Sequence, residues 1–287
     1  MVPPTNLDQH DRPAEAFRQP ADGRSLPCVT QRSASPRAMP TVYPHLPNAP
    51  IVEAIVDLRV RPQEQFDVMG LKELHSAIAE DYPTVEEQRL MQGRFQFSEA
   101  GLVSAGHGRA IRGFRATGRE GRNVVQFRID GFTFSRLTPY QTWESLFGEA
   151  WRLWGMYRQI AQPRAVTRLA TRFVNRLTFS EQLRLEDYFV ASPDVPDGLP
   201  DEFVSFLYRY SLPPVDGVSS NVTLMSEASS PGRHEAAIVF DIDCFVQEDD
   251  LVADDDQRIM DHFGNLRDMK NRIFFKSVTQ KALERFA

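Results

Sequence analysis

Hydrophobic and polar residues alternate through residues 51–60, where the regularly patterned part of the chain begins. Successive side chains of a β-strand point to opposite faces of a sheet, so this period of two predicts a half-buried strand. The intervening positions include Glu53, Asp57 and Arg59, which are therefore expected on the solvent side of the sheet. The apolar positions on the other side are Val52, Ala54, Val56, Leu58 and Val60.

The spacing of apolar residues predicts one helix over residues 66–79, stopped by Pro83, and a second over residues 140–161. Three strands are expected between them, at about 89–99, 102–117 and 122–136. In the third of these strands the apolar positions change parity after Asp130, which predicts a β-bulge at Gly131.

Aromatic residues follow one side of the predicted second helix at steps of three and four. An aromatic stripe with this spacing is typical of a helix face in the core rather than of a cofactor site. The stripe consists of Tyr140, Trp143, Phe147, Trp151 and Trp154.

The order of elements then repeats. The pattern predicts a strand over residues 165–179, a short irregular helical region within 181–207, and a long helix after Val252. Between these helical parts, strands are expected near residues 206–212, 219–228 and 234–247.

The fold class predicted from this order is α+β. Two β-α-β-β-β-α units, residues 41–163 and 164–287, would pack as one globular body, with an extended antiparallel sheet backed by two long helices. The order is similar to that of helix-grip folds and of TATA-binding-protein-like saddles, a likeness of fold that implies no function. Residues 1–40 are rich in Pro, Arg, Gln and Ser without a hydrophobic period, so we expect either a disordered arm or a start codon placed upstream of Met39.

Composition narrows the cellular setting. The two cysteines, Cys28 and Cys244, are far apart and neither belongs to a CxxC pair, which fits a reducing cytoplasm rather than a disulfide framework. No apolar run approaches the roughly 20 residues of a membrane-spanning helix. The start of the chain has no signal-peptide pattern. We therefore expect a cytoplasmic protein that does not bind membranes.

Charge is distributed unevenly along the chain. The net charge is −6, yet residues 107–180 contain 13 Arg and 4 acidic residues, whereas residues 181–287 contain 21 acidic and 10 basic residues. Either the two regions attract each other within one fold, or the basic region presents an anion-binding surface. A protein that coats DNA non-specifically is disfavoured by the negative total.

The predicted strands place charged residues on common faces. Residues two or four positions apart in a strand point to the same side, so three strands each present a charged face. If these strands are neighbours, one polar sheet surface results. It is either a ladder of cross-strand ion pairs, each worth about 0.2–1 kcal/mol, or a groove that binds an anion through Arg or a divalent ion through carboxylates. The candidate ligand-binding residues are Glu53, Asp57, Arg59, Arg168, Arg172, Arg176, Asp241 and Asp243.

Other chemistry has little support in the sequence. The phosphate-binding, nucleophile-elbow, zinc-protease and EF-hand signatures are all missing, and the six histidines are scattered, so no cofactor or metal site is predicted. Aromatic residues among the arginines would suit stacking on single-stranded nucleic acid. Most of them have the parity of core residues, however, which makes nucleic acid a less favoured partner. These residues are Phe114, Phe127, Phe132 and Phe134.

Several segments of residues 41–287 resemble a sporadically distributed family of uncharacterised bacterial proteins with no assigned reaction. The most distinctive is the opening motif LPNAPIVEAIVDLRV, residues 46–60. Where that family tends to have Leu-His, this chain has Leu266-Arg267. The resemblance implies an accessory role in mobile or defence-type gene neighbourhoods. The other matching segments are Tyr140–Trp143, Arg172–Arg176, Asp241–Asp243, Asn271–Phe274 and Ser277–Thr279.

Taken together, these features predict a binding or protein-interaction module with a protein partner. The alternative is an enzyme that acts on a phosphorylated or nucleic-acid substrate at the polar sheet face.

Overall fold

The alternation near residue 51 forms β1, Ile51–Arg61, a central strand of the sheet. Its apolar side is packed in the core, where Val56 and Leu58 are each 1% exposed. Glu53 and Arg59 are half-buried on the other side, as the pattern predicts. Asp57 lies on that side too but is only 8% exposed, so part of the polar face is shielded from solvent.

The computed structural model describes residues 43–98, 101–179, 184–191, 204–227 and 236–287, with residues 193, 195, 198 and 199. For residues 90–109 it describes the backbone alone, except at 99 and 100. The predictions for residues 1–40, including the alternative start at Met39, lie outside this part of the chain, as does Cys28. Residues Thr41–Ala287 belong to one compact unit.

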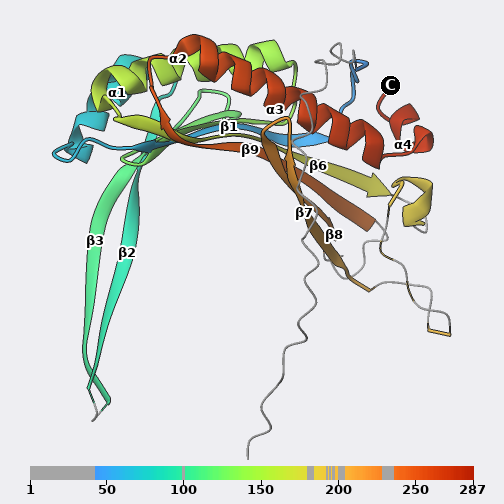
Figure 1. Cartoon of the computed structure of the whole chain (residues 1–287), viewed down its shortest axis with the longest axis horizontal. Coiled ribbons are helices and arrows are strands. Elements are labelled where there is room, and N and C mark those ends of the chain that lie inside the picture. The colour runs from blue at the N-terminus through green and yellow to red at the C-terminus, as the bar shows by residue number, and fades with distance from the viewer. Residues whose placement is uncertain are drawn as a thin grey trace, which may run out of the picture. The chain divides into compact units, whose positions relative to one another are not determined.

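An α+β fold with a nine-stranded antiparallel sheet results, as the sequence predicts for the class (Figure 1). The strands are ordered β2-β3-β4-β5-β1-β6-β9-β8-β7, so β1 and β6 lie side by side where the two halves of the chain meet. Besides β1, the strands are β2 Thr84–Ser98, β3 Gly101–Thr117, β4 Asn123–Arg128, β5 Gly131–Leu137, β6 Ala165–Phe179, β7 Leu207–Val215, β8 Val218–Ser226 and β9 Ala236–Leu251.

Three helices cover one face of this sheet (Figure 1). Helix α1 packs against α2 and β3, α2 packs on β1 and β5, and α3 packs on β6, β8 and β9. No described helix is both long and apolar enough to cross a membrane. The helices are α1 Leu71–Ile78, α2 Trp143–Ala161, α3 Asp256–Ser277 and α4 Gln280–Glu284, with short 3₁₀ turns at Val68–Gly70 and Leu185–Asp187.

The predicted strand over 122–136 is wrong, because the chain forms two strands, β4 and β5, joined by a tight turn at Ile129-Asp130. Arg128 pairs with Gly131, and Phe127 pairs with Phe132 on the core face. A two-residue hairpin turn shifts the parity of the core positions by one, which imitates the signature of a bulge. A Cβ at Gly131 would lie 2.5 Å from the carbonyl oxygen of Leu58, so glycine is required there.

The first half therefore has four strands between its helices rather than three, and the predicted unit is wrong in this count. In the second half three strands, β7 to β9, precede α3, as predicted. Within the described part of residues 181–207, the only helical turn is the 3₁₀ turn at Leu185–Asp187. Strand β6 has the bounds that its alternation predicts.

The aromatic stripe of α2 packs mainly between helices and sheet. Trp154 is fully buried against Phe132, and Phe147 contacts Phe263 of α3 with ring centres 5.2 Å apart. The stripe is thus core at its centre, as predicted. Trp143, the first residue of α2, instead faces a pocket, as does Tyr140, which lies before the helix and not within it as predicted.

Helix α3 begins with a side-chain cap, which gives a direct stability test. The carboxylate of Asp255 accepts a hydrogen bond from the backbone N–H of Arg258 at 3.1 Å. Losing an N-cap costs about 1 kcal/mol, so Asp255→Ala should lower the free energy of unfolding by that amount in urea titrations. Asp255→Asn retains an acceptor and should lose much less. Equal losses in both variants would contradict a capping role.

Candidate functional site

The charged residues predicted as a site lie on the sheet face that the helices leave uncovered. Strand β6 pairs with β1 on one side and with β9 on the other, so the three charged strands are neighbours. In this register Arg59 lies opposite Arg168, and Arg172 lies opposite Asp243.

Asp57 is the centre of the most buried group of charges on this face. Its carboxylate oxygens lie 3.2 Å from Arg59, 3.2 Å from Arg128 of β4 and 3.4 Å from Arg168 of β6. The hydroxyl of Thr133 donates a hydrogen bond of 2.5 Å to the same carboxylate. Arg128 and Thr133 are residues that the sequence pattern did not single out. Asp57 therefore has its acceptor positions filled by the protein itself.

The remaining charges on the face are also paired. Asp243 accepts two hydrogen bonds from Arg168, at 3.1 and 3.2 Å. Arg172 makes a bidentate pair with Asp241, at 2.8 and 2.6 Å, and this pairing raises the pKa of the guanidinium.

Two further predicted residues flank this group of charges. Arg176 pairs with Glu227 at 2.8 Å. Glu53 forms no ion pair with another described residue, but its charge contributes to the raised pKa of Arg172. The geometry of the face therefore fits the ion-pair ladder better than an open anion or cation site. Within the described residues, no group of three or more His, Cys, Asp or Glu side chains is arranged to hold a metal ion.

The basic segment does not expose stacking aromatics. Its four candidate phenylalanines are all buried in the core, at most 2% exposed. Of the described Arg side chains between residues 112 and 176, all form ion pairs except Arg136, which donates a hydrogen bond to Asn123. Several pair with acids of the second half, as between Arg158 and Asp256. Mutual attraction between the two charged regions thus accounts for part of the basic surplus, since four of these arginines pair with acids of residues 181–287.

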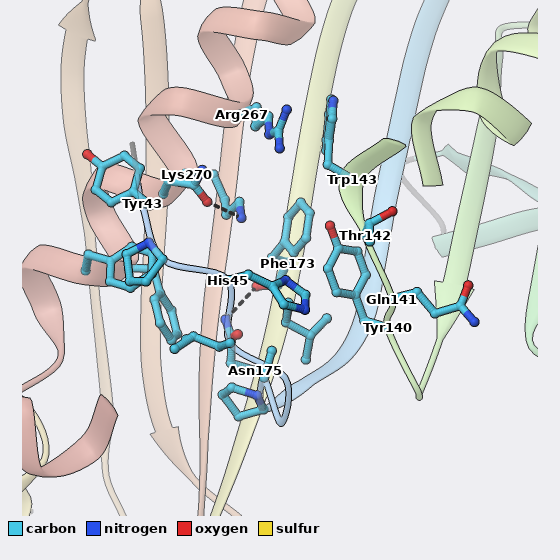
Figure 2. A pocket seen from close by; sticks show the side chains of 18 of the residues that line it. Tyr43, His45, Tyr140, Gln141, Thr142, Trp143, Phe173, Asn175, Arg267 and Lys270 are labelled. Atoms are coloured by element: carbon cyan, nitrogen blue, oxygen red, sulfur yellow. Dashed lines mark hydrogen bonds between the residues drawn. The ribbon is translucent and has the colours of Figure 1, made fainter. Parts of the chain in front are cut away.

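A different site lies on the helical side of the sheet. A pocket of about 280 Å³ opens between the start of α2, the middle of α3, strand β6 and the segment of residues 43–51 (Figure 2). Aromatic rings form much of its wall: Tyr43, Tyr140, Trp143, Phe173, Phe274 and Phe275.

Phe173 of β6 is the central ring of this wall. Tyr140 meets it edge-on, with ring centres 5.6 Å apart, and Trp143 lies nearly parallel to it at 6.5 Å. Lys270 of α3 places its amine 4.1 Å from the ring centre, on the side away from Tyr140 (Figure 2). Rings at these distances attract one another through their edges and faces, and a cation is attracted to a ring face.

Lys270 is the unusual group of the pocket. Its side chain is half-buried because it faces the cavity, but the amine is otherwise surrounded by protein. This burial, reinforced by the nearby positive charge of Arg267, lowers the pKa of the amine to about 7. The amine donates a hydrogen bond of 2.5 Å to the side-chain oxygen of Asn271. No described carboxylate lies within ion-pair distance of it.

Helical spacing brings these groups together. Four lining residues share one face of α3, because they follow one another at steps of three, one and three. They are Arg267, Lys270, Asn271 and Phe274. Arg267 is already occupied, because its guanidinium lies 3.0 Å from the carboxylate of Glu144 and over the ring of Trp143. Lys270 is thus the one charged side chain lining the pocket, among the described residues, whose charge is not balanced.

Two polar side chains complete the pocket. The amide of Asn175 is buried in β6 and donates a hydrogen bond of 2.9 Å to the carbonyl of Phe240. The hydroxyl of Tyr140 makes no hydrogen bond to another described residue. Burial raises the pKa of that hydroxyl, which therefore remains a donor at neutral pH.

The sequence pattern did not predict this pocket, although two of its features indicate it. Lys270 follows Leu266 by four positions and precedes Ile273 by three, so a lysine interrupts the apolar stripe of α3. In addition, four of the segments that carry the family resemblance supply lining residues: the opening motif and the segments Tyr140–Trp143, Arg172–Arg176 and Asn271–Phe274.

A second hollow, of about 480 Å³, is a weaker candidate. Its charged groups already satisfy one another, as in the hydrogen bond of 2.7 Å from Tyr82 to Glu149 and the ion pair of 2.7 Å between Arg152 and Glu149. It has no group comparable to Lys270.

A scan against models of protein families found no match to this chain, and a search of curated protein sequences found none either. The chemistry of the pocket therefore has to be inferred from its own residues.

Proposed function

We propose that this chain is a binding module that takes up a small organic molecule in the pocket around Lys270. One observation carries the proposal: a buried amine with no carboxylate partner among the described residues faces an aromatic-walled cavity. Ionisable groups with strongly shifted pKa values, set in apolar pockets with a few polar side chains, are typical of ligand sites. Burying a charge without a partner is unfavourable for folding alone, which also supports a role in binding.

The enzyme alternative at the polar sheet face has less support. Three of its four carboxylates already accept hydrogen bonds from arginines, so they are not free to act as bases or metal ligands. Nucleic-acid binding is likewise disfavoured by the paired arginines of the basic segment.

The wider setting of the binding module is also a proposal. The order β1-β5-β4-β3 outward from the centre is matched by β6-β9-β8-β7 on the other side, which supports two related units, 41–163 and 164–287, forming a saddle. The family resemblance supports a cytoplasmic accessory role with a protein partner. In that setting, occupation of the pocket would be the signal that the partner detects.

The pocket can be tested by filling it. Ala49 lines the cavity, whereas Ala77 is exposed on α1, so Ala49→Trp and Ala77→Trp form a matched pair. We expect 2-naphthoate or 2-naphthamide, added as small aromatic probes, to bind the unchanged protein and Ala77→Trp in isothermal titration calorimetry. Affinity should fall at least about tenfold in Ala49→Trp, because the indole occupies the space of the probe.

Circular dichroism and thermal unfolding would verify that both variants are folded. Failure of both probes to bind the unchanged protein, or equal binding to Ala49→Trp, would contradict the proposed function.

A further inference from the structure

The charges around the pocket indicate that its ligand has a charged group in addition to an apolar part. Three residues that carry a charge when ionised line it: Glu144, Arg267 and, in its protonated form, Lys270. Glu144 and Arg267 neutralise each other at 3.0 Å, which leaves a single positive charge, that of Lys270, without a counterion among the described residues. A bound group with one negative charge would therefore make the pocket neutral.

The hydrogen-bonding capacity of Lys270 also indicates a negatively charged ligand. A protonated amine has three N–H donors, and one of them is used by Asn271. The remaining donors have no acceptor among the described side chains, and the amine faces the cavity (Figure 2). A carboxylate offers two acceptor oxygens to such donors, and a hydrogen bond between charged groups is stronger than one between neutral groups.

The walls favour a flat ligand of limited size. A volume of about 280 Å³ is near the lower end of the roughly 300–1,000 Å³ that small-molecule pockets span, so one or two rings would fill it. Tyr140 and Trp143 are half-buried and offer ring surface against which a planar group can pack, whereas Phe173, which both of them contact, is only 1% exposed. The free hydroxyl of Tyr140 adds a second donor close to Phe173.

We infer that the ligand of this pocket is a small planar carboxylic acid, whose carboxylate pairs with the Lys270 amine while its flat body packs against Tyr140 and Trp143. This inference rests on the proposed function and adds the chemical class of the ligand. A phosphate monoester fits less well, because its second negative charge would have no cation left to pair with.

Pairing of an acid with Lys270 would change the number of protons bound to the protein, and this change can be measured. An anion beside the amine favours its charged form, so binding of an acid should raise the pKa of Lys270 from about 7 and draw a proton from solution. At pH 7.5 we expect uptake of roughly 0.5–0.8 proton for each acid bound, and none for a neutral ligand of the same shape. The other titratable or charged groups around the amine and the pocket are Arg267, Cys244, Glu144, His45, Tyr43 and Tyr140.

The test compares 2-naphthoate with its neutral counterpart 2-naphthamide by calorimetry in buffers of different ionisation enthalpy. We expect the acid to bind roughly 10- to 100-fold more tightly than the amide at pH 7. Both this preference and the proton uptake should disappear in Lys270→Met. They should persist in Lys276→Met, which removes an exposed lysine from the same helix.

A second measurement uses the unchanged protein alone. Raising the pH from 6 to 9 deprotonates Lys270 but leaves the acid charged, so the acid-to-amide preference should fall at least about tenfold. If both probes bind equally, without proton uptake, the inferred ligand class is wrong while the pocket remains a binding site. If neither probe binds, the proposed function fails, and the inference fails with it.

Discussion

Replacing Asp57 with alanine is expected to lower the free energy of unfolding by about 3 kcal/mol, because it removes the nearest carboxylate of the buried Arg128 and leaves it only the more distant Asp130. The Asp57 side chain is 11% exposed and contacts Arg128, whose side chain is 12% exposed. Removing one member of a buried pair forces the other to remain desolvated, and the hydroxyl of Thr133 loses its acceptor as well. Urea unfolding followed by circular dichroism would measure the loss.

Asp241→Ala is the matched control for this prediction. It removes a carboxylate from the same sheet face, but its partner Arg172 has a side chain that is 49% exposed and can be solvated. Ion pairs with such access to water contribute about 0–1 kcal/mol, so the loss should stay below 1 kcal/mol. Equal losses in the two variants would mean that water reaches the Asp57 group and that the polar face has no protected centre.

The second large effect concerns Lys270 and pH. Its pKa is about 7 in the folded protein, whereas an unfolded chain has the ordinary lysine value of about 10.4. Between these values the unfolded chain binds more protons than the folded one, so stability rises with pH through this range. Below pH 7 both states are protonated, and the folded state retains the full cost of the buried charge.

Replacing Lys270 with methionine should therefore stabilise the ligand-free protein most at pH 7 and below. The advantage of Lys270→Met over the unchanged protein should shrink by roughly 2 kcal/mol between pH 7 and pH 9, since one pKa unit corresponds to about 1.4 kcal/mol. Urea unfolding at several pH values measures this difference, and comparing two variants cancels the titration of other groups. Cys244, whose pKa burial raises to about 11, titrates above this range.

Lys276→Met provides the reference for the pH series. This lysine is exposed on the same helix, so its removal should leave the pH dependence parallel to that of the unchanged protein. A pH-independent difference between Lys270→Met and the unchanged protein would show that the Lys270 amine is freely hydrated. The pocket would then lack the uncompensated charge on which the proposed function depends.

The two substituted residues lie on opposite faces of one sheet, and their removal is expected to change the stability of the fold in opposite directions. On the uncovered face, Asp57 is surrounded by arginines, so removing it destabilises the fold. On the helical face, Lys270 has no counterion among the described residues, so removing it stabilises the fold. Structural ion pairs are expected to show the first behaviour, and groups kept for binding at the expense of stability are expected to show the second.

The sequence by itself determined the α+β class, most elements and the charged face. Period-two alternation places Glu53 and Asp57 on one side of β1 and gives the bounds of β6. Both were predictable because successive side chains of any strand point to opposite faces of the sheet, whatever the rest of the fold. The apolar stripe of α3 was equally local, with Ile259, Phe263 and Leu266 buried as their spacing predicts.

Only the tertiary structure decided which of these residues could act as a site. The parity change at Asp130-Gly131 fits a bulge and a hairpin alike, and strand pairing resolves it. The arginines acquire their partners through register between strands far apart in sequence, as Arg168 does with Asp57 and Asp243. The pocket needs four separate segments to meet around Phe173 and Lys270, and the lowered pKa of that amine arises from burial, which no local pattern encodes.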